Sequence, residues 1–383
     1  MRKKLLALMT VGLLATVTIT ACDDSDQSSD TSSGSDSSGA SSGKARVGVI
    51  MPDTKSSQRW STDDPKFLKA AFDAANVPVE IQNAQGDRAN FVKIGTDMLN
   101  GGVKVLIIAN LDADSGKAVI DLAKEKKIPV IDYDRLTLNG GADYYVSFDN
   151  EAVGRYQAYG LISCLSEKKV KNPIIAELNG SSTDNNSALF KDGYDGQLDV
   201  KYDSAEYTKG PDQFVPDWDS EEAGKIFEQM LAQQPKIGGV LAANDGLGNA
   251  VIQVLRKKGL SGKVPVTGQD ATLQGLQNLL TGEQCVTIYK KVQREAEAAA
   301  GLAVKLFKGD KPTTPGQIKD PESGGYVPFV SLEPVQIDKF KVKDVVADGF
   351  VTKKQLCTGK YAKLCNTYGV GVAPSASADT DDK

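Results

Sequence analysis

Short apolar segments and amphipathic segments alternate along most of this chain, and this alternation constrains its fold more than any other feature. Five apolar or β-branched segments come first, at residues 46–50, 77–81, 103–108, 128–131 and 144–148. Near-continuous apolar segments of this length are typical of strands that are covered on both faces. Between the first two, Asp64 is expected as a helix N-cap, followed by Pro65 at the first helical position. The pattern predicts a parallel sheet covered by helices.

A second series of similar length follows the first. Strands are expected at residues 174–178, 200–202, 237–241, 264–267 and 285–289, and helices at about 186–198, 219–233, 246–259 and 271–281. Strands that alternate with helices imply parallel sheets joined by right-handed crossovers. The chain has 383 residues, which is enough for two domains. The two series therefore predict an α/β protein with two Rossmann-like lobes.

The chain after residue 289 predicts that the two lobes are interleaved. A helix is expected at residues 293–308, followed by strands at 326–330 and 335–337. A third crossing between the lobes would account for this order, so we expect a hinge of three segments. The expected domains are 44–150 plus 290–328 for the N-terminal lobe, 151–289 plus 329–370 for the C-terminal lobe, and 371–383 for a disordered tail. Sites in such folds form at the carboxyl ends of strands, here across the cleft between the lobes.

Residues 1–22 have the pattern of a secretory signal peptide. Three basic residues precede an uncharged stretch from residue 5 to residue 19, which is shorter than the ~20 residues that a membrane span needs. The stretch ends in small residues before Cys22 and resembles the bacterial lipobox, in which the Cys is lipidated and becomes the new N-terminus. The alternative is an ordinary cleaved signal that happens to contain a Cys. We expect a protein outside the cytoplasm, lipid-anchored at Cys22 to the outer face of the cell membrane or in the periplasm.

The charged residues are unevenly distributed along the chain. Residues 23–43 contain ten Ser, five Asp and three Gly, with no basic and no large apolar side chain. Such a segment cannot bury enough surface to offset its ordering entropy, so we expect a disordered tether. The net charge of -5 comes mainly from the terminal segments, because residues 44–373 contain 41 basic and 42 acidic residues. A nearly neutral body without a basic stripe argues against nucleic acid as a partner.

Polar and aromatic residues gather just after the expected strands of both series. Sugar hydroxyls both donate and accept hydrogen bonds, so planar carboxylate, amide and guanidinium groups suit them, and the C–H faces of a pyranose pack on Trp. Each Asp or Asn alone is more simply a helix cap or turn residue, and each Trp core filling. Their recurrence in both series favours a carbohydrate site. The set comprises Asp53, Arg59, Trp60, Asp134, Arg135, Asp149, Asn150, Asp184, Asn185, Asn186, Trp218, Asn244, Asp245, Gln269, Asp270 and Lys290.

Seven short motifs occur in the order and approximate spacing of bacterial periplasmic sugar-binding proteins. They are Gln58-Arg59-Trp60, Tyr133-Asp134-Arg135, Val146-Ser147-Phe148-Asp149-Asn150, Asp184-Asn185-Asn186, Ala243-Asn244-Asp245, Gly268-Gln269-Asp270 and Tyr289-Lys290. From about Ala45 to Phe350 the sequence resembles the substrate-binding proteins of ABC sugar importers, and the D-xylose-binding members most of all. The resemblance implies the type I periplasmic binding protein fold. It also implies a monomer whose two lobes close around a sugar by hinge motion and present it to membrane permease subunits.

By the same resemblance, ten residues would bind the sugar. Hydrogen bonds to its hydroxyls and ring oxygen would come from Arg59, Asp134, Arg135, Asp184, Asn186, Asn244, Asp270 and Lys290. Trp60 and Trp218 would sandwich the ring. Two positions depart from the family pattern, since Asp53 stands alone where xylose binders have two acidic residues and Phe214 stands where a Trp is frequent. The ligand is thus expected to be xylose or a related neutral aldopyranose.

Four cysteines remain after Cys22, and they allow three pairings. Export makes disulfides permissible. Cys357 and Cys365 flank a short polar segment. The expected layout places Cys164, at the end of a helix, and Cys285, at the start of a strand, at the same pole of the second lobe. We therefore expect the pairs Cys164–Cys285 and Cys357–Cys365; the alternative is free thiols.

Three functions are compatible with this sequence. The first is the sugar-binding lipoprotein of an ABC importer, which contacts the membrane through its lipid anchor. The second is an enzyme that uses Asp134 and Asp270, which we disfavour because Arg135 and Lys290 would hold nearby carboxylates ionised. The chain also lacks histidine, which removes His-based catalysis and His-ligated metals. The third is a sugar-sensing receptor for chemotaxis or a histidine kinase, with the same pocket. We expect no catalysis, no cofactor and no metal.

Overall fold

A computed structural model describes residues 45–371; the expected signal peptide with Cys22, the tether and residues 372–383 lie outside the described residues. The first lobe is built on a seven-stranded sheet in the order β10-β11-β5-β4-β3-β1-β2. Its strand pairs are parallel except for β10 with β11. The strands are β1 Arg46–Met51, β2 Val79–Asn83, β3 Val103–Ile108, β4 Val130–Tyr133, β5 Tyr144–Phe148, β10 Gly316–Lys319 and β11 Tyr326–Leu332.

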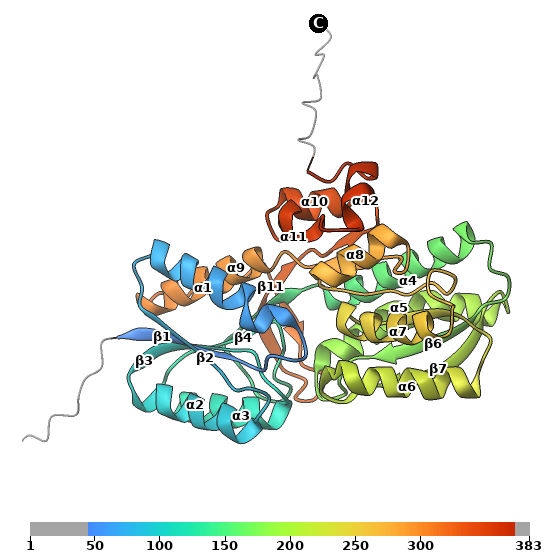
Figure 1. The fold of residues 1–383 in the computed structure, drawn as a ribbon. Helices are drawn as coiled ribbons and strands as arrows, with labels where there is room; N and C mark the ends of the chain where they lie inside the picture. The colour runs from blue at the N-terminus through green and yellow to red at the C-terminus, as the bar shows by residue number, and fades with distance from the viewer. Residues whose placement is uncertain (1–44, 372–383) are drawn as a thin grey trace, which may run out of the picture. The chain divides into compact units, whose positions relative to one another are not determined.

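Helices cover both faces of this sheet (Figure 1). Helices α1 (Asp63–Ala74) and α9 (Val292–Phe307) lie on one face, and α2 (Arg88–Asn100) and α3 (Ala113–Glu125) lie on the other. Along β1, Val49 packs into the core beneath α1 and α9, whereas Ile50 packs into the core beneath α2 and α3. Both faces are therefore buried, which is why the strands are continuously apolar.

The second lobe is built on the parallel sheet β7-β6-β8, formed by β6 (Ile174–Asn179), β7 (Thr208–Phe214) and β8 (Ile237–Ala242). Isolated parallel bridges join Val240 to Val266 and Gln269 to Ile288. The latter leads to the antiparallel pair of β9 (Thr287–Tyr289) and β12 (Val335–Ile337). The helices of this lobe are α4 Asn150–Glu167, α5 Asn185–Asp203, α6 Ser220–Gln233, α7 Asp245–Lys257 and α8 Leu273–Thr281.

Three segments cross between the lobes, as the sequence predicts. β5 leads into α4, β9 leads into α9, and β11 leads into β12. The third crossing comes after Leu332 rather than at residue 328, because β11 remains paired with β5 from Phe329 to Leu332. The two expected series of strands are thus two interleaved α/β lobes.

Two expected strands are wrong in the second lobe. Residues 200–202 belong to α5, which continues to Asp203, and the strand that follows is β7. β7 has the sequence TKGPDQF and mostly half-buried or exposed side chains, as an edge strand that contains Pro and Gly does. Residues 264–267 form a bridge at Val266 instead of a strand. Both errors arise because β-branched residues favour strands only weakly against tertiary context.

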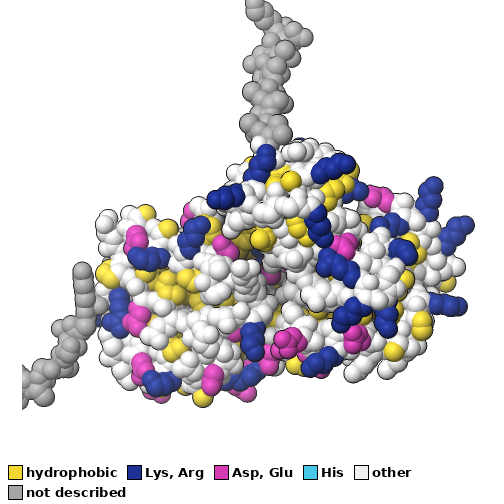
Figure 2. Space-filling model, viewed as in Figure 1, with side chains coloured by type: hydrophobic (Ala, Val, Ile, Leu, Met, Phe, Trp, Pro, Cys, Tyr) yellow, Lys and Arg dark blue, Asp and Glu magenta, His cyan; other side chains and the backbone are white. Residues whose placement is uncertain are grey.

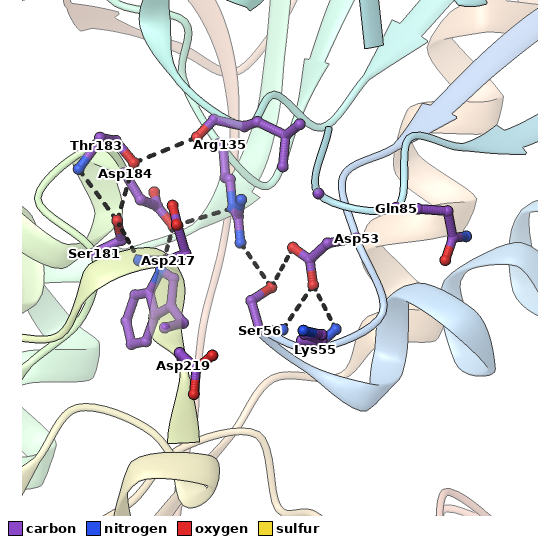
Figure 3. A pocket seen from close by; sticks show the side chains of 13 residues that line it. Asp53, Lys55, Ser56, Gln85, Arg135, Ser181, Thr183, Asp184, Asp217 and Asp219 are labelled. Atoms are coloured by element: carbon purple, nitrogen blue, oxygen red, sulfur yellow. Dashed lines mark hydrogen bonds and ion pairs between the residues drawn. The ribbon is translucent and has the colours of Figure 1, made fainter. Parts of the chain in front are cut away.

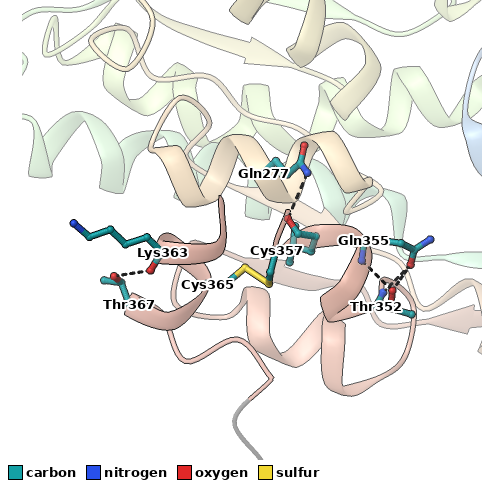
Figure 4. Close-up of a disulfide and its surroundings, with 8 residues drawn as sticks. Gln277, Thr352, Gln355, Cys357, Lys363, Cys365 and Thr367 are labelled. Atoms are coloured by element: carbon teal, nitrogen blue, oxygen red, sulfur yellow. Dashed lines mark hydrogen bonds between the residues drawn. A yellow bond between two sulfur atoms is a disulfide. The ribbon is translucent and has the colours of Figure 1, made fainter. Parts of the chain in front are cut away.

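Residues 338–371 form a small helical region that we call the cap. It contains α10 (Val342–Ala347), α11 (Lys353–Leu356) and α12 (Tyr361–Thr367), which pack on α8 through one apolar cluster. A disulfide joins Cys357 to Cys365, and the side-chain amide of Gln277 on α8 donates to the backbone carbonyl of Leu356 (Figure 4). The second disulfide joins Cys164 on α4 to Cys285. These are the two pairs expected from the sequence.

Candidate ligand-binding site

All ten residues that the sequence assigns to ligand binding line one cavity between the lobes, which we call the inner cavity. Its empty volume is about 300 Å³. The ten are buried, with at most 8% of each side chain's surface exposed. Three residues that were not expected at the site also line it: Ser56, Ser57 and Phe190. Gln269 lines it too, and it belongs to the polar and aromatic set of the sequence but not to the ten. The sequence offers no signal for the two serines or for Phe190, and Gln269 follows a predicted strand like the ten.

The first lobe contributes its residues from loops at the carboxyl ends of β1 and β4. Arg59 and Trp60 lie in a short 3-10 helix, Gln58–Ser61, after β1. The Trp60 indole N–H donates to the Ser56 hydroxyl at 3.1 Å, and the Arg59 guanidinium lies 4.4 Å from the centre of the Trp60 ring. Asp134 follows β4 with φ of 63°, a left-handed conformation that costs a non-glycine residue free energy. Such strain is typical of functional loops.

Helix caps position two of the second lobe's residues. Asp184 caps α5 by accepting from the Asn186 N–H at 3.0 Å, and Asn244 caps α7 by accepting from the Leu247 N–H at 2.9 Å. Trp218 is held by the Asp184 carboxylate, which accepts from the indole N–H at 3.1 Å. The two interpretations offered for such residues, helix cap and ligand contact, are therefore compatible, since Asp184 and Asn244 cap helices and line the inner cavity.

Arg59 is fixed by three buried carboxylates. Its Nε and Nη2 donate to Asp64 at 2.8 and 2.6 Å, Nη2 donates to Glu295 at 2.5 Å, and Nη1 donates to Asp134 at 2.8 Å. Asp64 does not cap α1 as expected; it lies inside the helix, and the N-cap residue is Thr62. Since a guanidinium has five N–H groups, these contacts leave one N–H of Arg59 for a ligand. The role of Arg59 is thus partly to orient Asp134.

Asp134 stays ionised in this surrounding. Burial alone would raise its pKa, but the charges of Lys290, Arg59 and Arg135 outweigh burial and lower the pKa of Asp134 to about 2. The Lys290 ammonium lies 3.2 Å from the Asp134 carboxylate. A carboxylate with so low a pKa accepts hydrogen bonds and does not act as a general acid, which disfavours the enzyme hypothesis.

The cavity carries balanced charge. Three cations, Arg59, Arg135 and Lys290, face three carboxylates, Asp134, Asp184 and Asp270, along its wall. Arg135 and Asp184 form an ion pair at 3.0 Å across the cleft. A charged ligand would upset this balance in a buried space, whereas a neutral polyhydroxyl ligand would satisfy the paired donors and acceptors.

Hydrogen bonds join the lobes around the cavity. The Asn186 side-chain amide donates to the backbone carbonyl of Asp134 at 2.9 Å and to its carboxylate at 3.1 Å. The Asn244 amide also donates to the Ser56 carbonyl at 3.2 Å, and the Ser57 hydroxyl donates to Asp270 at 3.1 Å. Both lobes thus contribute binding groups and contact each other through them.

A second cavity, with an empty volume of about 720 Å³, adjoins the first, and we call it the outer cavity (Figure 3). It shares four residues with the inner cavity: Ser56, Arg135, Asp184 and Trp218. Asp53 lines it and accepts from the backbone N–H and hydroxyl of Ser56, both at 2.6 Å. Phe214, the other position that departs from the family pattern, lines neither cavity and is 40% exposed.

Residues 45–371 show neither a membrane-spanning helix nor a metal-binding cluster. No helix in this range is both long and apolar enough to cross a membrane. The same range holds no cluster of three or more acidic or Cys side chains placed to bind a metal ion.

Comparison with known proteins identifies the family. Residues 47–311 match the family described as periplasmic binding protein domain. The chain belongs to this family. It is 35% identical over 332 residues to the D-xylose-binding periplasmic protein of Escherichia coli K12, an alignment that covers 85% of this chain and 97% of that protein. It is 32% identical to a multiple sugar-binding periplasmic receptor of Rhizobium radiobacter, covering 80% and 90% of the two chains.

Solved structures agree with the fold of this periplasmic binding protein. An ABC transporter solute-binding protein from Clostridium phytofermentans with bound β-D-glucose superposes with a TM-score of 0.75 at 28% identity, covering 82% of this chain and 100% of that one. The fold is the type I periplasmic binding protein fold, as the sequence resemblance implies, and proteins of this kind bind and transport solutes without catalysis.

Proposed function

We propose that this chain is the substrate-binding protein of an ABC sugar importer and that it binds a neutral aldopyranose, xylose or a close relative, in the inner cavity. The observation that carries the proposal is the lining of that cavity: two Trp, one Phe and eleven polar side chains from both lobes, with three cations against three carboxylates. The bound sugar would hold the lobes closed, and the closed form would engage the permease. Relatives named for xylose and for multiple sugars support the ligand class.

Intrinsic fluorescence tests the site directly, because Trp60 and Trp218 are the chain's two tryptophans. Titration with xylose, glucose, galactose, arabinose and ribose should change the emission with at least one sugar. Calorimetry on the Trp218→Ala and Asp134→Asn variants should show that sugar's affinity reduced at least tenfold. The matched control is Asp143→Asn, whose carboxylate lies outside both cavities and should not affect binding. If no aldose binds, or if these variants bind as the unmodified chain does, the site assignment is wrong.

The location and partners form a second part of the proposal. We propose that the mature chain begins at lipidated Cys22, is tethered by residues 23–43 outside the cytoplasm, and acts as a monomer beside its permease. The domain boundaries follow the three crossings, with the third placed after Leu332. A Cys22→Ser variant should be released from membranes at high salt, where electrostatic contacts with lipid are screened. Retention of that variant on membranes at high salt would contradict lipid anchoring. Loss of sugar uptake in a deletion strain supports the importer; normal uptake with lost sugar sensing supports a sensory receptor.

A further inference from the structure

The folded part is nearly neutral in total, but its basic and acidic residues are unevenly divided between the cap and the rest of the chain. The cap, residues 338–371, contains seven Lys and three Asp, whereas residues 45–337 contain 33 basic and 39 acidic residues. A cap with net charge +4 therefore stands on a body with net charge -6. Figure 2 shows dark-blue side chains spread over the part of the surface that the cap forms.

The lysines of the cap are free to bind a partner. Six are exposed and Lys339 is half-buried, and within residues 45–371 none of the seven forms an ion pair with a carboxylate. The cap's acidic residues are partly engaged, because Asp348 pairs with Lys291 of the body at 2.6 Å and Asp338 accepts from two backbone N–H groups. The seven are Lys339, Lys341, Lys343, Lys353, Lys354, Lys360 and Lys363.

An exposed aromatic residue stands between two of these lysines in the sequence. Phe340 is 59% exposed, is flanked in sequence by Lys339 and Lys341, and packs edge-on against Tyr368 at 5.6 Å between ring centres. An exposed Phe together with exposed lysines on one small region is typical of a membrane-interface contact, where the ring enters the headgroup region and the ammonium groups meet phosphate. A site for a soluble anion would not need the exposed ring.

The cap presents these groups rigidly. Val342, Val345, Leu356 and Cys365 are buried in the apolar cluster shared with α8, and the Cys357–Cys365 disulfide closes the segment between α11 and α12. No residue of the cap lines the inner or the outer cavity. A contact made through the cap would therefore leave the ligand site unobstructed.

From this charge separation we infer that the cap docks on the surface of a bilayer containing anionic phospholipid, and so orients the body on the membrane to which it is tethered. The occupant is the anionic lipid headgroup surface. This contact is separate from the lipid anchor and does not depend on which sugar is bound.

Vesicle co-sedimentation tests the inference. Residues 23–383, which lack Cys22 and its lipid, are incubated with vesicles of phosphatidylcholine plus phosphatidylglycerol or of phosphatidylcholine alone. We expect salt-sensitive binding to the anionic vesicles. The combined Lys353→Gln, Lys354→Gln, Lys360→Gln and Lys363→Gln variant should bind them far more weakly, with roughly a fivefold loss per lysine at low salt.

A matched variant controls for total charge. Lys104, Lys126, Lys236 and Lys311 are exposed lysines of the body with no side-chain hydrogen bond or ion pair within residues 45–371, and their combined change to Gln removes the same charge. This control should retain binding, and thermal unfolding should show both variants folded. Equal losses in the two variants, or equal binding of the unmodified chain to neutral vesicles, would overturn the inference. Cap-dependent binding to purified permease in neutral lipid without binding to anionic vesicles would also overturn it, and would make the cap a protein contact.

Discussion

Gly180, which follows β6, leaves room for the indole ring of Trp218. A Cβ atom at this position would lie 2.0 Å from Cη2 and Cζ2 of the ring, so Gly180→Ala must displace Trp218. Overpacking of this kind costs about 1–3 kcal/mol of unfolding free energy. We expect Gly180→Ala to lose that stability, to shift the Trp emission and to weaken sugar binding.

Gly196 in α5 is the matched control for this change. A Cβ there meets no atom within 4 Å, and Gly196→Ala should raise the free energy of unfolding slightly, because Ala restricts the unfolded chain more than Gly does. Urea unfolding and calorimetry measure both variants. Normal sugar affinity in Gly180→Ala would show that the indole ring does not contact the ligand.

Glu295 gives a second prediction at this scale. Burial, together with the charges of Asp134 and Asp64, raises its pKa to about 8 against the attraction of Arg59 and Lys290. A carboxyl whose pKa is higher in the folded chain stabilises that chain fully below its unfolded pKa, and this stability is lost as the pH rises through about 8. Glu295→Gln keeps a neutral side chain, so its unfolding free energy should decline less between pH 5 and pH 9, by up to about 1.4 kcal/mol per pH unit.

Urea unfolding across that pH range checks the prediction for Glu295. Glu297→Gln is the control, because Glu297 is exposed on the same helix and bonds only to Gln293 on that helix within the described residues. Asp132 and Asp245, whose pKa values burial raises to about 7, remain in both variants and contribute equally. Parallel pH profiles for Glu295→Gln and the unmodified chain would contradict the protonation of Glu295.

The residues that line the inner cavity are easier to predict from the sequence than the buried residues that hold them in place. Asp134, Asp184 and Asn244 directly follow strands or start helices, so their place in the sequence predicts a shared edge of the sheets. Asp64 and Glu295 lie inside helices, and a carboxylate there has no local feature that separates it from a solvated one. Their contacts to Arg59 arise only when α1 and α9 pack against the same face of the first sheet.

At the scale of elements, the N-cap residues of α2 and α7 allow an effect on stability to be distinguished from an effect on sugar binding. Asp87 caps α2 by accepting from the Asn90 N–H at 2.9 Å, and Asn244 caps α7 with the same geometry and also lines the inner cavity. Loss of an N-cap side chain lowers the free energy of unfolding by about 1 kcal/mol. Asp87→Ala and Asn244→Ala should therefore lose similar stability in urea, while calorimetry should show weakened sugar binding only for Asn244→Ala. Equal sugar affinities in the two variants would show that Asn244 serves only as the N-cap of α7 and does not bind the sugar.

The sequence predicts a helix or strand correctly where its local pattern of apolar residues matches the burial of that element in the fold. The strands of the first sheet are buried on both faces and their apolar sequence shows it, whereas β7 is an edge strand with a polar sequence and left no comparable pattern. Residues 200–202 have strand propensity but complete the last turn of α5, where Val200 is 65% exposed. The cap helices are short, and their stability comes from packing on α8 and from the disulfide rather than from local propensity.

At the scale of the whole molecule, an exposed ion pair and a buried amide network both join the lobes. We expect the buried network to contribute more to sugar binding. Arg88 and Asp217 form an ion pair at 3.2 Å between the lobes, but they are 46% and 69% exposed. Exposed pairs contribute about 0–1 kcal/mol and weaken with salt. Asp217→Asn should therefore raise the dissociation constant for the sugar less than about fivefold, and only at low salt.

Asn150 should have the larger effect although it lies outside both cavities. Its side-chain amide donates to Oδ1 of Asn186 at 2.8 Å, which orients the Asn186 amide toward Asp134 of the other lobe. Removing a buried donor costs about 1–3 kcal/mol, so Asn150→Ala should weaken sugar binding roughly tenfold or more, at every salt concentration. Calorimetry at low and high salt measures both variants. If Asp217→Asn were the more damaging change, exposed charge rather than the buried amide network would control closure.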